Sequence, residues 1–309
     1  MARVLYLGGL GRSGTTLVER LLGELPSVCA LGEIVHLWQR DIRDDERCGC
    51  GARFSACTFW KRVGERAFGG WSTVDVARVH ALRDAVERTR HIPRLTKPSP
   101  EVLEYASFYT RVYRAAAEVS GAEVVVDSSK HSALAHVLRW AGDIDLRVVH
   151  VVRDARGVAY SWTKTVSRPE TDGTDEMTRY SPSRSALLWN AHNAAFGLLA
   201  RRGVPVHRVR YEQFLADPRA ALTDLAAYAG VPITDADLAF LGEGHADLGV
   251  GHSAAGNPMR FTVGRLALRR DDTWTVALPP RQRRLVGAVC GPMLRAYGYP
   301  LNPVSQEAS

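Results

Sequence analysis

The sequence predicts an α/β protein of three layers (α/β/α), in which helices cover both faces of a central, mostly parallel sheet. Short apolar runs of strand length alternate with longer segments whose apolar residues recur at helical spacing. The strand-like runs are apolar throughout, which is typical of parallel strands buried on both faces. No repeat, low-complexity linker or boundary interrupts this alternation, and we expect a single domain over residues 1–309.

The expected elements follow one another in the order of a layered α/β chain. Predicted strands cover 3–8, 123–127, 146–152 and 205–210. The first predicted helix runs from the glycine-rich turn at 8–14 to Pro26, a second kind of start is a serine cap at Ser128 or Ser129 for a helix to about 141, and Asp154 caps a further helix. The other predicted helices cover 74–90, 100–119, 183–201, 218–229, 235–242 and 280–296, and the last has a kink at Pro292. We expect loops or irregular structure at 41–58 and 242–264.

Composition and charge exclude several classes of protein. With 46% hydrophobic and 24% charged residues the chain is an ordinary globular one. Its net charge of +7 is spread along the sequence, which disfavours a nucleic-acid-binding tail and is compatible with a site for an anionic ligand. No run reaches the roughly 18 apolar residues of a membrane span, and the apolar N-terminal run is too short for a signal peptide. We therefore expect a cytoplasmic protein without a transmembrane segment or nucleic-acid partner.

The first functional motif is the turn Gly9-Leu-Gly-Arg-Ser-Gly-Thr-Thr16 between the first strand and its helix. It fits the phosphate-loop pattern G-x-x-x-x-G-K-[ST] except that Thr15 stands at the lysine position. Backbone N–H groups and the helix dipole favour an anion at such a turn, and Arg12 can add a bidentate contact. Nucleotide triphosphatases need the missing lysine together with Mg²⁺, so this P-loop-like turn suits a smaller anion without a metal.

The second motif follows the clearest of the predicted strands. Arg153 stands where the strand at 146–152 ends, and Ser161 lies about two turns into the helix that follows. Open α/β sheets bind ligands at the carboxyl ends of their strands, and an arginine and a hydroxyl there can converge on one phosphate. The alternative for Arg153 is a plain ion pair with a nearby carboxylate.

Three motifs occur together in this chain: R-S-G-T-T after the first strand, Leu-Gly-Glu about twenty residues later, and V-R-D-x-R-x-x-x-x-S. Through these motifs the chain resembles the sulfotransferases that use 3′-phosphoadenosine 5′-phosphosulfate (PAPS). The likeness is greatest to bacterial and tyrosylprotein sulfotransferases, and it covers residues 4–38, 124–162 and 206–212, more loosely 252–262. It implies transfer of a sulfuryl group from PAPS to an acceptor hydroxyl. It further implies cofactor-binding roles for Arg12, Ser13, Gly14, Thr15 and Thr16 at the 5′-phosphosulfate, for Arg153 and Ser161 at the 3′-phosphate, and for Tyr211, Asn257 and Arg260 elsewhere along the cofactor.

The same resemblance implies the catalytic residues. Glu33 stands at the position of the proposed base in the tyrosylprotein branch, and Lys130 resembles a lysine that reaches the sulfate bridge. Arg12 and Lys130 would offset negative charge in the transition state. His36 is the rival base. The surroundings differ from the tyrosylprotein pattern, which has a carboxylate and an arginine where this chain has Gly32 and Val35.

The sequence alone leaves two other functions and several classes of acceptor as alternatives. A phosphate-loop kinase or nucleotide hydrolase would need the loop lysine and a Mg²⁺-holding acid, and a catalytically inactive module would bind adenosine 3′,5′-bisphosphate without transferring anything. For the sulfotransferase the acceptor is a carbohydrate, a glycolipid or a small natural product. Peptide tyrosine is disfavoured by the altered surroundings of Glu33.

Three of the five cysteines lie close together, at Cys48, Cys50 and Cys57. Zinc takes four ligands, usually at C-x₂₋₄-C spacing, whereas this spacing is C-x-C-x₆-C. His36 or Cys29 are candidates for a fourth ligand, and a disulfide or free thiols are the alternatives. We assign no metal ligand on this pattern alone.

Overall fold

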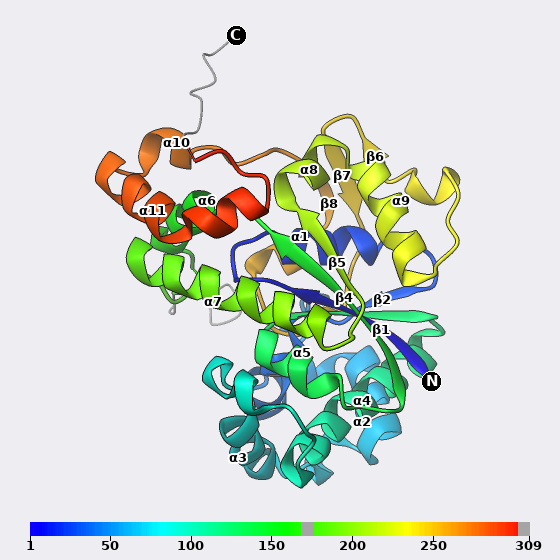
Figure 1. Ribbon diagram of the computed structural model, residues 1–309. Helices are drawn as coiled ribbons and strands as arrows, with labels where there is room; N and C mark the ends of the chain where they lie inside the picture. Colours follow the sequence, from blue (N-terminus) through cyan, green and yellow to red (C-terminus); the bar gives the residue numbers. More distant parts are fainter. Residues whose placement is uncertain (168–175, 302–309) are drawn as a thin grey trace.

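The computed structural model describes residues 1–167 and 176–301, and a five-stranded parallel sheet lies at its centre (Figure 1). The strand order is β2-β3-β1-β4-β5, and every neighbouring pair is parallel, which confirms the predicted fold class. The strands are β1 (Ala2–Gly8), β2 (Val28–Ala30), β3 (Val124–Lys130), β4 (Ile144–Val152) and β5 (Val206–Arg210).

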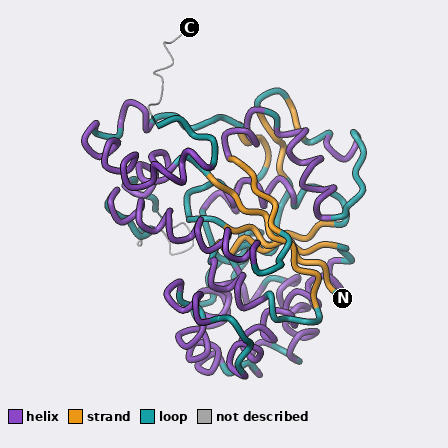
Figure 2. The backbone as a smooth tube through the Cα atoms, in the orientation of Figure 1, coloured by secondary structure: helices purple, strands orange, loops and turns teal. Residues whose placement is uncertain are grey.

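Helices surround this sheet on both faces, as the purple and orange tubes of Figure 2 show. They are α1 (Thr15–Leu22), α2 (Thr58–Phe68), α3 (Val76–Val86), α4 (Pro100–Ser120), α5 (Ser132–Leu138), α6 (Ala155–Thr163), α7 (Pro182–Arg201), α8 (Tyr211–Ala216), α9 (Pro218–Ala229), α10 (Trp274–Ala277) and α11 (Pro280–Ala296). Short 3₁₀ turns are η1 (Ile34–His36), η3 (Phe54–Ala56), η4 (Trp71–Thr73), η5 (Thr89–Arg94), η7 (Ala236–Leu238) and η8 (Pro258–Phe261), and η2 (Leu37–Arg43) is a π-helix. Over the described ranges, every helix is too short or too polar to pass through a lipid bilayer.

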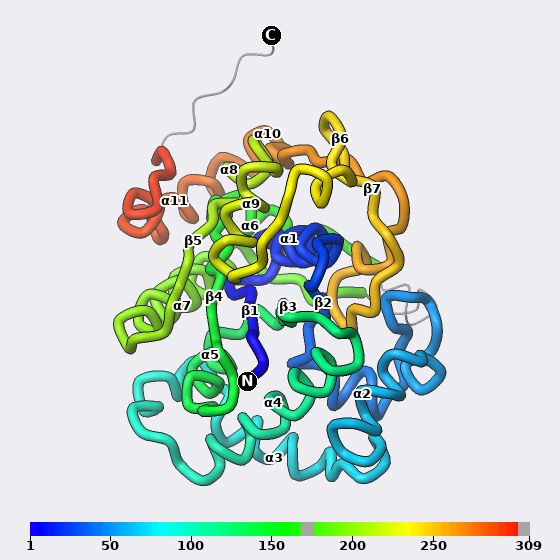
Figure 3. Tube along the Cα trace, turned by 90° about the vertical axis from the view of Figure 1, so that its right-hand side faces the viewer, coloured from blue at the N-terminus to red at the C-terminus, as the bar shows by residue number. Residues whose placement is uncertain are grey.

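The two faces of the sheet bury separate apolar clusters, because successive side chains of a strand point in opposite directions. Val4 and Tyr6 of β1 pack with α4, α5 and α7, whereas Leu5 and Leu7 pack with α1, α8 and α9. All four side chains are at most 1% exposed. Figures 1 and 3 show the same division, with α4 and α5 on one side of β1 and α1 and α9 on the other.

The predicted helix from Ser128 or Ser129 is wrong at its start. Strand β3 continues through both serines to Lys130, and α5 covers only Ser132–Leu138. Neither serine caps a helix: Ser128 Oγ donates to Glu19 at 2.6 Å, and Ser129 Oγ accepts from the Val35 N–H at 2.9 Å. These long-range partners hold the backbone extended where local sequence favours a cap.

The predicted helix at 235–242 is also wrong, and the following stretch is more ordered than expected. Only the turn η7 is helical there. The chain then forms a small antiparallel sheet of β6 (Leu241–Gly242), β7 (His245–Leu248) and β8 (Gly264–Ala267). Strands of two to four residues are too short to show a periodic apolar pattern. Helix α2 likewise begins at the end of the segment expected to be a loop.

The packing under β1 gives a stability prediction. Phe196 of α7 is fully buried, and its ring lies 4.8 Å from that of His150 in β4. We expect Phe196→Ala to lower the free energy of unfolding by about 3–5 kcal/mol, because it leaves a cavity that the rigid sheet cannot fill. Leu187→Ala on the same helix, where the side chain is 64% exposed, should change it by less than about 0.5 kcal/mol. Urea unfolding measures both, and equal losses would contradict this packing.

Candidate functional site

A cavity of about 560 Å³ lies at the carboxyl ends of β1, β3 and β4. The loop after β1, the residues after β3 and Arg153 after β4 all border it, as expected for a ligand site on a parallel sheet. Among its lining residues are Gly9, Arg12, Gly14, Thr15, Thr16, Glu33, His36, Lys130, His131, Arg153, Ser161, Trp162, Tyr180, His192, Tyr211, Gly256 and Asn257.

The loop after β1 contains three residues with positive φ, Gly9, Arg12 and Gly14. Gly14 has φ 96°, and a Cβ added there would lie 2.4 Å from the Tyr211 ring, so only glycine fits. Arg12 has φ 74°, which is uncommon for a residue with a side chain. Helix α1 begins directly after this turn, at Thr15. The N-terminus of α1 and its free N–H groups therefore face the cavity.

Polar groups of this loop are buried without a partner. Within the part of the chain that the structure describes, Arg12 Nε and Nη2 and Thr15 Oγ1 form no hydrogen bond. Burial lowers the pKa of Arg12, and the opposing charge of Glu33 raises it. Buried donors of this kind are costly unless something satisfies them. The loop is thus built to receive an anionic or strongly hydrogen-bonding group.

Arg153 reaches back to the same loop. Its Nη1 donates to the Arg12 carbonyl at 3.3 Å, and its guanidinium lies 4.7 Å from the centre of the Tyr211 ring. Helix α6 follows it, capped by Asp154, whose carboxylate accepts from the Arg156 N–H at 2.9 Å. Ser161 on α6 lines the cavity as well. The two sequence motifs therefore flank one shared cavity.

Arg153 forms the ion pair that the sequence left open as an alternative, and its partner is Asp271, a residue that the sequence did not identify. Its carboxylate lies 3.4 Å from Arg153 Nη2 and 3.2 Å from Lys164 Nζ. Burial raises the pKa of Asp271, but a hydrogen bond from Thr273 and the charges of Lys164 and Arg153 outweigh it and lower the value to about 2. The charged run at 269–272 looks like an ordinary solvated segment, and it gives no local signal of this contact.

Glu33, Lys130 and His36 meet on the side of the cavity next to β3. Lys130 Nζ forms a close ion pair with Glu33 Oε1, and both side chains are only 12% exposed. His36 Nε2 lies 3.9 Å from Glu33 Oε2. Lys130 has φ 69°, the second non-glycine residue of the cavity in the left-handed region. The predicted catalytic side chains are thus gathered at one point beside the Arg12 loop.

His36 is held neutral by its surroundings. Burial is the main cause that lowers its pKa well below the usual value, and the charges of His131 and Arg40 act in the same direction. The two histidine rings meet edge to face at 5.7 Å. His131 in turn is hydrogen-bonded to Glu87 at 2.6 Å. These surroundings disfavour the protonated ring, so His36 accepts a proton less readily than an ordinary histidine.

Two predicted cofactor-binding residues are not brought to this cavity. Neither Ser13 nor Arg260 is among the described residues that line it. Ser13 is 1% exposed, and its N–H donates to the Leu10 carbonyl at 3.2 Å within the turn. Arg260 is also 1% exposed, its guanidinium lies over the Phe261 ring at 4.5 Å, and its charge partly opposes the rise that burial causes in the pKa of Asp41. Its neighbour Asn257 does line the cavity.

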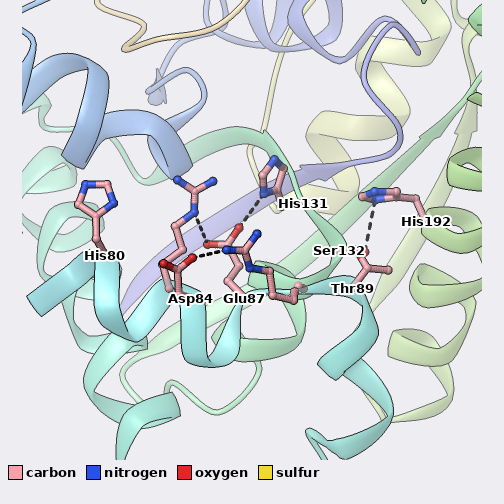
Figure 4. A pocket seen from close by; sticks show the side chains of 10 residues that line it. His80, Asp84, Glu87, Thr89, His131, Ser132 and His192 are labelled. Carbon is pink, nitrogen blue, oxygen red and sulfur yellow. Dashed lines mark hydrogen bonds and ion pairs between the residues drawn. The ribbon is translucent and has the colours of Figure 1, made fainter. Parts of the chain in front are cut away.

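A second cavity, of about 410 Å³, adjoins the first and shares His131 and His192 with it. Figure 4 shows its charged lining from α3, η5, α5 and α7, with Glu87 facing His131 and Ser132 facing His192. The Ser132 hydroxyl lies 3.3 Å from His192 Nδ1. The sequence analysis assigned nothing here, because scattered charges on helices usually form a solvated face.

Comparison with known proteins places this site in a family. The model of the sulfotransferase family matches residues 5–235. Human carbohydrate sulfotransferase 3 is 24% identical over 171 residues, which cover 51% of this chain and 34% of that protein, so the match spans about a third of that relative.

One solved sulfotransferase domain supports the fold, and a second is reported beside it. The sulfotransferase domain from the curacin biosynthetic pathway is 14% identical, with 97% of this chain and 99% of that one covered at a TM-score of 0.53. The sulfotransferase domain from the Synechococcus PCC 7002 olefin synthase is 20% identical, with 97% and 96% covered at a TM-score of 0.48. Because the family model spans residues 5–235 of the 309, the chain belongs to the sulfotransferase family.

Proposed function

We propose that this sulfotransferase takes the sulfuryl group from PAPS and transfers it to a hydroxyl of a carbohydrate, a glycolipid or a small natural product. The observation that carries the proposal is the set of buried, unsatisfied donors in the described loop, Arg12 Nε and Nη2 and Thr15 Oγ1, on the wall of the same cavity as Arg153 and Ser161. Donors from these two neighbouring segments of one cavity wall suit a ligand with two anionic groups.

The residues present fit the phosphates of such a donor. Arg12, Gly14, Thr15 and Thr16 would hold the 5′-phosphosulfate at the N-terminus of α1, and Arg153 and Ser161 the 3′-phosphate. Tyr211 and Asn257 line the same cavity. When bound, the donor supplies the sulfuryl group. The hydroxyl-bearing Thr15 in place of a lysine supports binding without a metal.

The chain's own residues then have three tasks. The loop and Arg153 position the donor. Arg12 and Lys130 offset the negative charge that develops on the leaving phosphate and the sulfuryl oxygens. Glu33 takes the proton from the acceptor hydroxyl, and its ion pair with Lys130 fixes the carboxylate beside the loop. His36 is the second candidate base, because its Nε2 lies 3.9 Å from Glu33 Oε2 in the same cavity; burial lowers its pKa, which makes it a weaker proton acceptor than an ordinary histidine.

The second cavity is the route by which the acceptor would reach the donor. It meets the first at His131 and His192, next to Glu33 and His36. Its lining of histidines, arginines and carboxylates offers many hydrogen-bonding groups, which suit an acceptor that carries several hydroxyls. The site as a whole draws residues from Gly9 to Met259, which supports one domain over residues 1–309.

Donor binding can be tested with the product adenosine 3′,5′-bisphosphate. We expect it to bind the chain more tightly than ATP with Mg²⁺ in isothermal titration calorimetry at fixed salt. Arg153→Gln should weaken this binding about 10- to 100-fold, since a charged hydrogen bond to phosphate contributes roughly 1.5–3 kcal/mol. Ser161→Ala should weaken it about fivefold through loss of a neutral hydrogen bond.

The control for these variants is Arg114→Gln. Arg114 forms an ion pair with Asp143 at 3.8 Å, its side chain is 56% exposed, and it lies outside the described lining of the cavity. Its replacement should leave the affinity unchanged. Equal affinities for Arg153→Gln and Arg114→Gln would remove Arg153 from donor binding.

The base can be tested by single-turnover and steady-state kinetics with an accepted hydroxyl substrate. We expect Glu33→Gln to lower kcat about 10²- to 10⁴-fold, the usual contribution of a positioned general base. Its affinity for adenosine 3′,5′-bisphosphate should stay at the wild-type value, because the glutamine is isosteric. His36→Asn should lower kcat by a smaller factor. If Glu33→Gln keeps a kcat near the wild-type value while His36→Asn loses most of its kcat, the general base is His36 and not Glu33.

A further inference from the structure

The three clustered cysteines meet a histidine from a distant part of the chain. Ligand atoms of Cys48, Cys50, Cys57 and His252 all lie within 4.8 Å of one another. Cys50 Sγ and Cys57 Sγ are 3.8 Å apart. His252 Nδ1 lies 3.8 Å from Cys48 Sγ and 3.3 Å from Cys57 Sγ. The fourth group therefore follows Cys57 by 195 residues, and it is neither His36 nor Cys29, the two candidates considered from the sequence.

These separations are those of ligands around a tetrahedral ion. Zinc holds thiolates at about 2.3 Å and imidazoles at about 2.0–2.1 Å, so that tetrahedral ligands are spaced about 3.8 Å from sulfur to sulfur and about 3.5 Å from sulfur to nitrogen. We propose that Cys48, Cys50, Cys57 and His252 form a structural Cys₃His zinc site. Four protein ligands close the coordination sphere and leave no open position for a catalytic water.

A disulfide does not account for this cluster. An S–S bond is about 2.05 Å long, whereas Cys50 Sγ and Cys57 Sγ lie 3.8 Å apart. All five cysteines, each within the described ranges, are free thiols. Cys48 is fully buried and Cys57 is 2% exposed, and the partly buried Cys50 and His252 complete the group.

The surrounding structure already holds the ligands in place. The Cys48 N–H donates to the Ala52 carbonyl at 2.8 Å and the Gly51 N–H to the Cys48 carbonyl at 2.8 Å, which forms a tight turn around Cys50. Trp60 Nε1 donates to the His252 carbonyl at 2.8 Å, and the His252 ring stacks on Phe59 at 5.1 Å with an interplanar angle of 20°. Such outer contacts orient ligands around structural and catalytic metals alike.

The site would join two segments that flank the donor cavity. The Gly49 N–H donates to the Ser253 carbonyl at 3.0 Å, and the Ala254 N–H donates to the Leu31 carbonyl at 2.8 Å, two residues before Glu33. The segment that starts at His252 also carries Asn257 into the cavity. A zinc ion at the four ligands fixes this segment to the loop at 48–57. The proposal stands on the ligand geometry and does not depend on the identity of the sulfuryl donor.

The test is the metal content of the full chain, purified from cells grown with added zinc and without a chelator or a metal-affinity column. We expect about one zinc per chain by mass spectrometry of the elements, the stoichiometry of a single closed site. Cys57→Ser and His252→Ala should lose the zinc. Cys29→Ser is the matched control, because Cys29 lies in β2, outside the cluster, and that variant should keep the metal.

A second measurement covers the case in which these variants do not fold. The wild-type chain, with its zinc replaced by Co²⁺, should show the absorption bands of tetrahedral cobalt bound to thiolates. A chain that takes up neither zinc nor Co²⁺ and whose thiols all react with a thiol reagent in the presence of zinc overturns the proposal. A Cys50–Cys57 disulfide peptide in a non-reducing digest overturns it as well.

Discussion

The parallel pairing of β3, β1 and β4 is the constraint on which the site depends. Parallel strands end at the same edge, so the turn after β1, Lys130 after β3 and Arg153 after β4 necessarily emerge side by side. The buried side chains of β1 hold this register from both faces, through apolar clusters that leave no room for a shift by one residue. Three basic side chains from distant parts of the chain are brought around one cavity because the sheet fixes where each strand stops.

The sequence could predict those features that depend on interactions between residues close together along the chain. The fold class, the long helices and the strand ends depend on local patterns, and Arg12, Thr15, Arg153 and Ser161 lie where those patterns put them. Glu33 and Lys130 were expected from a resemblance, and His36 as a rival base three residues after Glu33; the structure brings the three together. Their roles as base and charge-stabilising groups stay predictions.

The parts that could not be predicted rest on partners remote in sequence. Ser128 and Ser129 continue a strand because their hydroxyls bond to α1 and to the segment after β2, which no local propensity records. Asp271 meets Arg153 across 118 residues, and His252 meets Cys57 across 195. Arg260 looked like a ligand-binding arginine, yet burial beside Asp41 and Phe261 keeps it from the cavity. In each case charge and residue type were visible, whereas the partner was decided by tertiary packing.

Arg12 and Lys130, the two cations nearest Glu33, share a backbone conformation that costs an ordinary residue roughly 1–2 kcal/mol relative to a right-handed one. Glycine would relax the main chain at either position, and it would also delete the cation. At Arg12, whose Nε and Nη2 are buried without a hydrogen bond among the described residues, selection for thermal stability and selection for the charged cavity act in opposite directions. Sequence libraries screened for melting temperature alone should therefore drift toward glycine or asparagine at position 12, whereas at position 130 the ion pair with Glu33 opposes that drift.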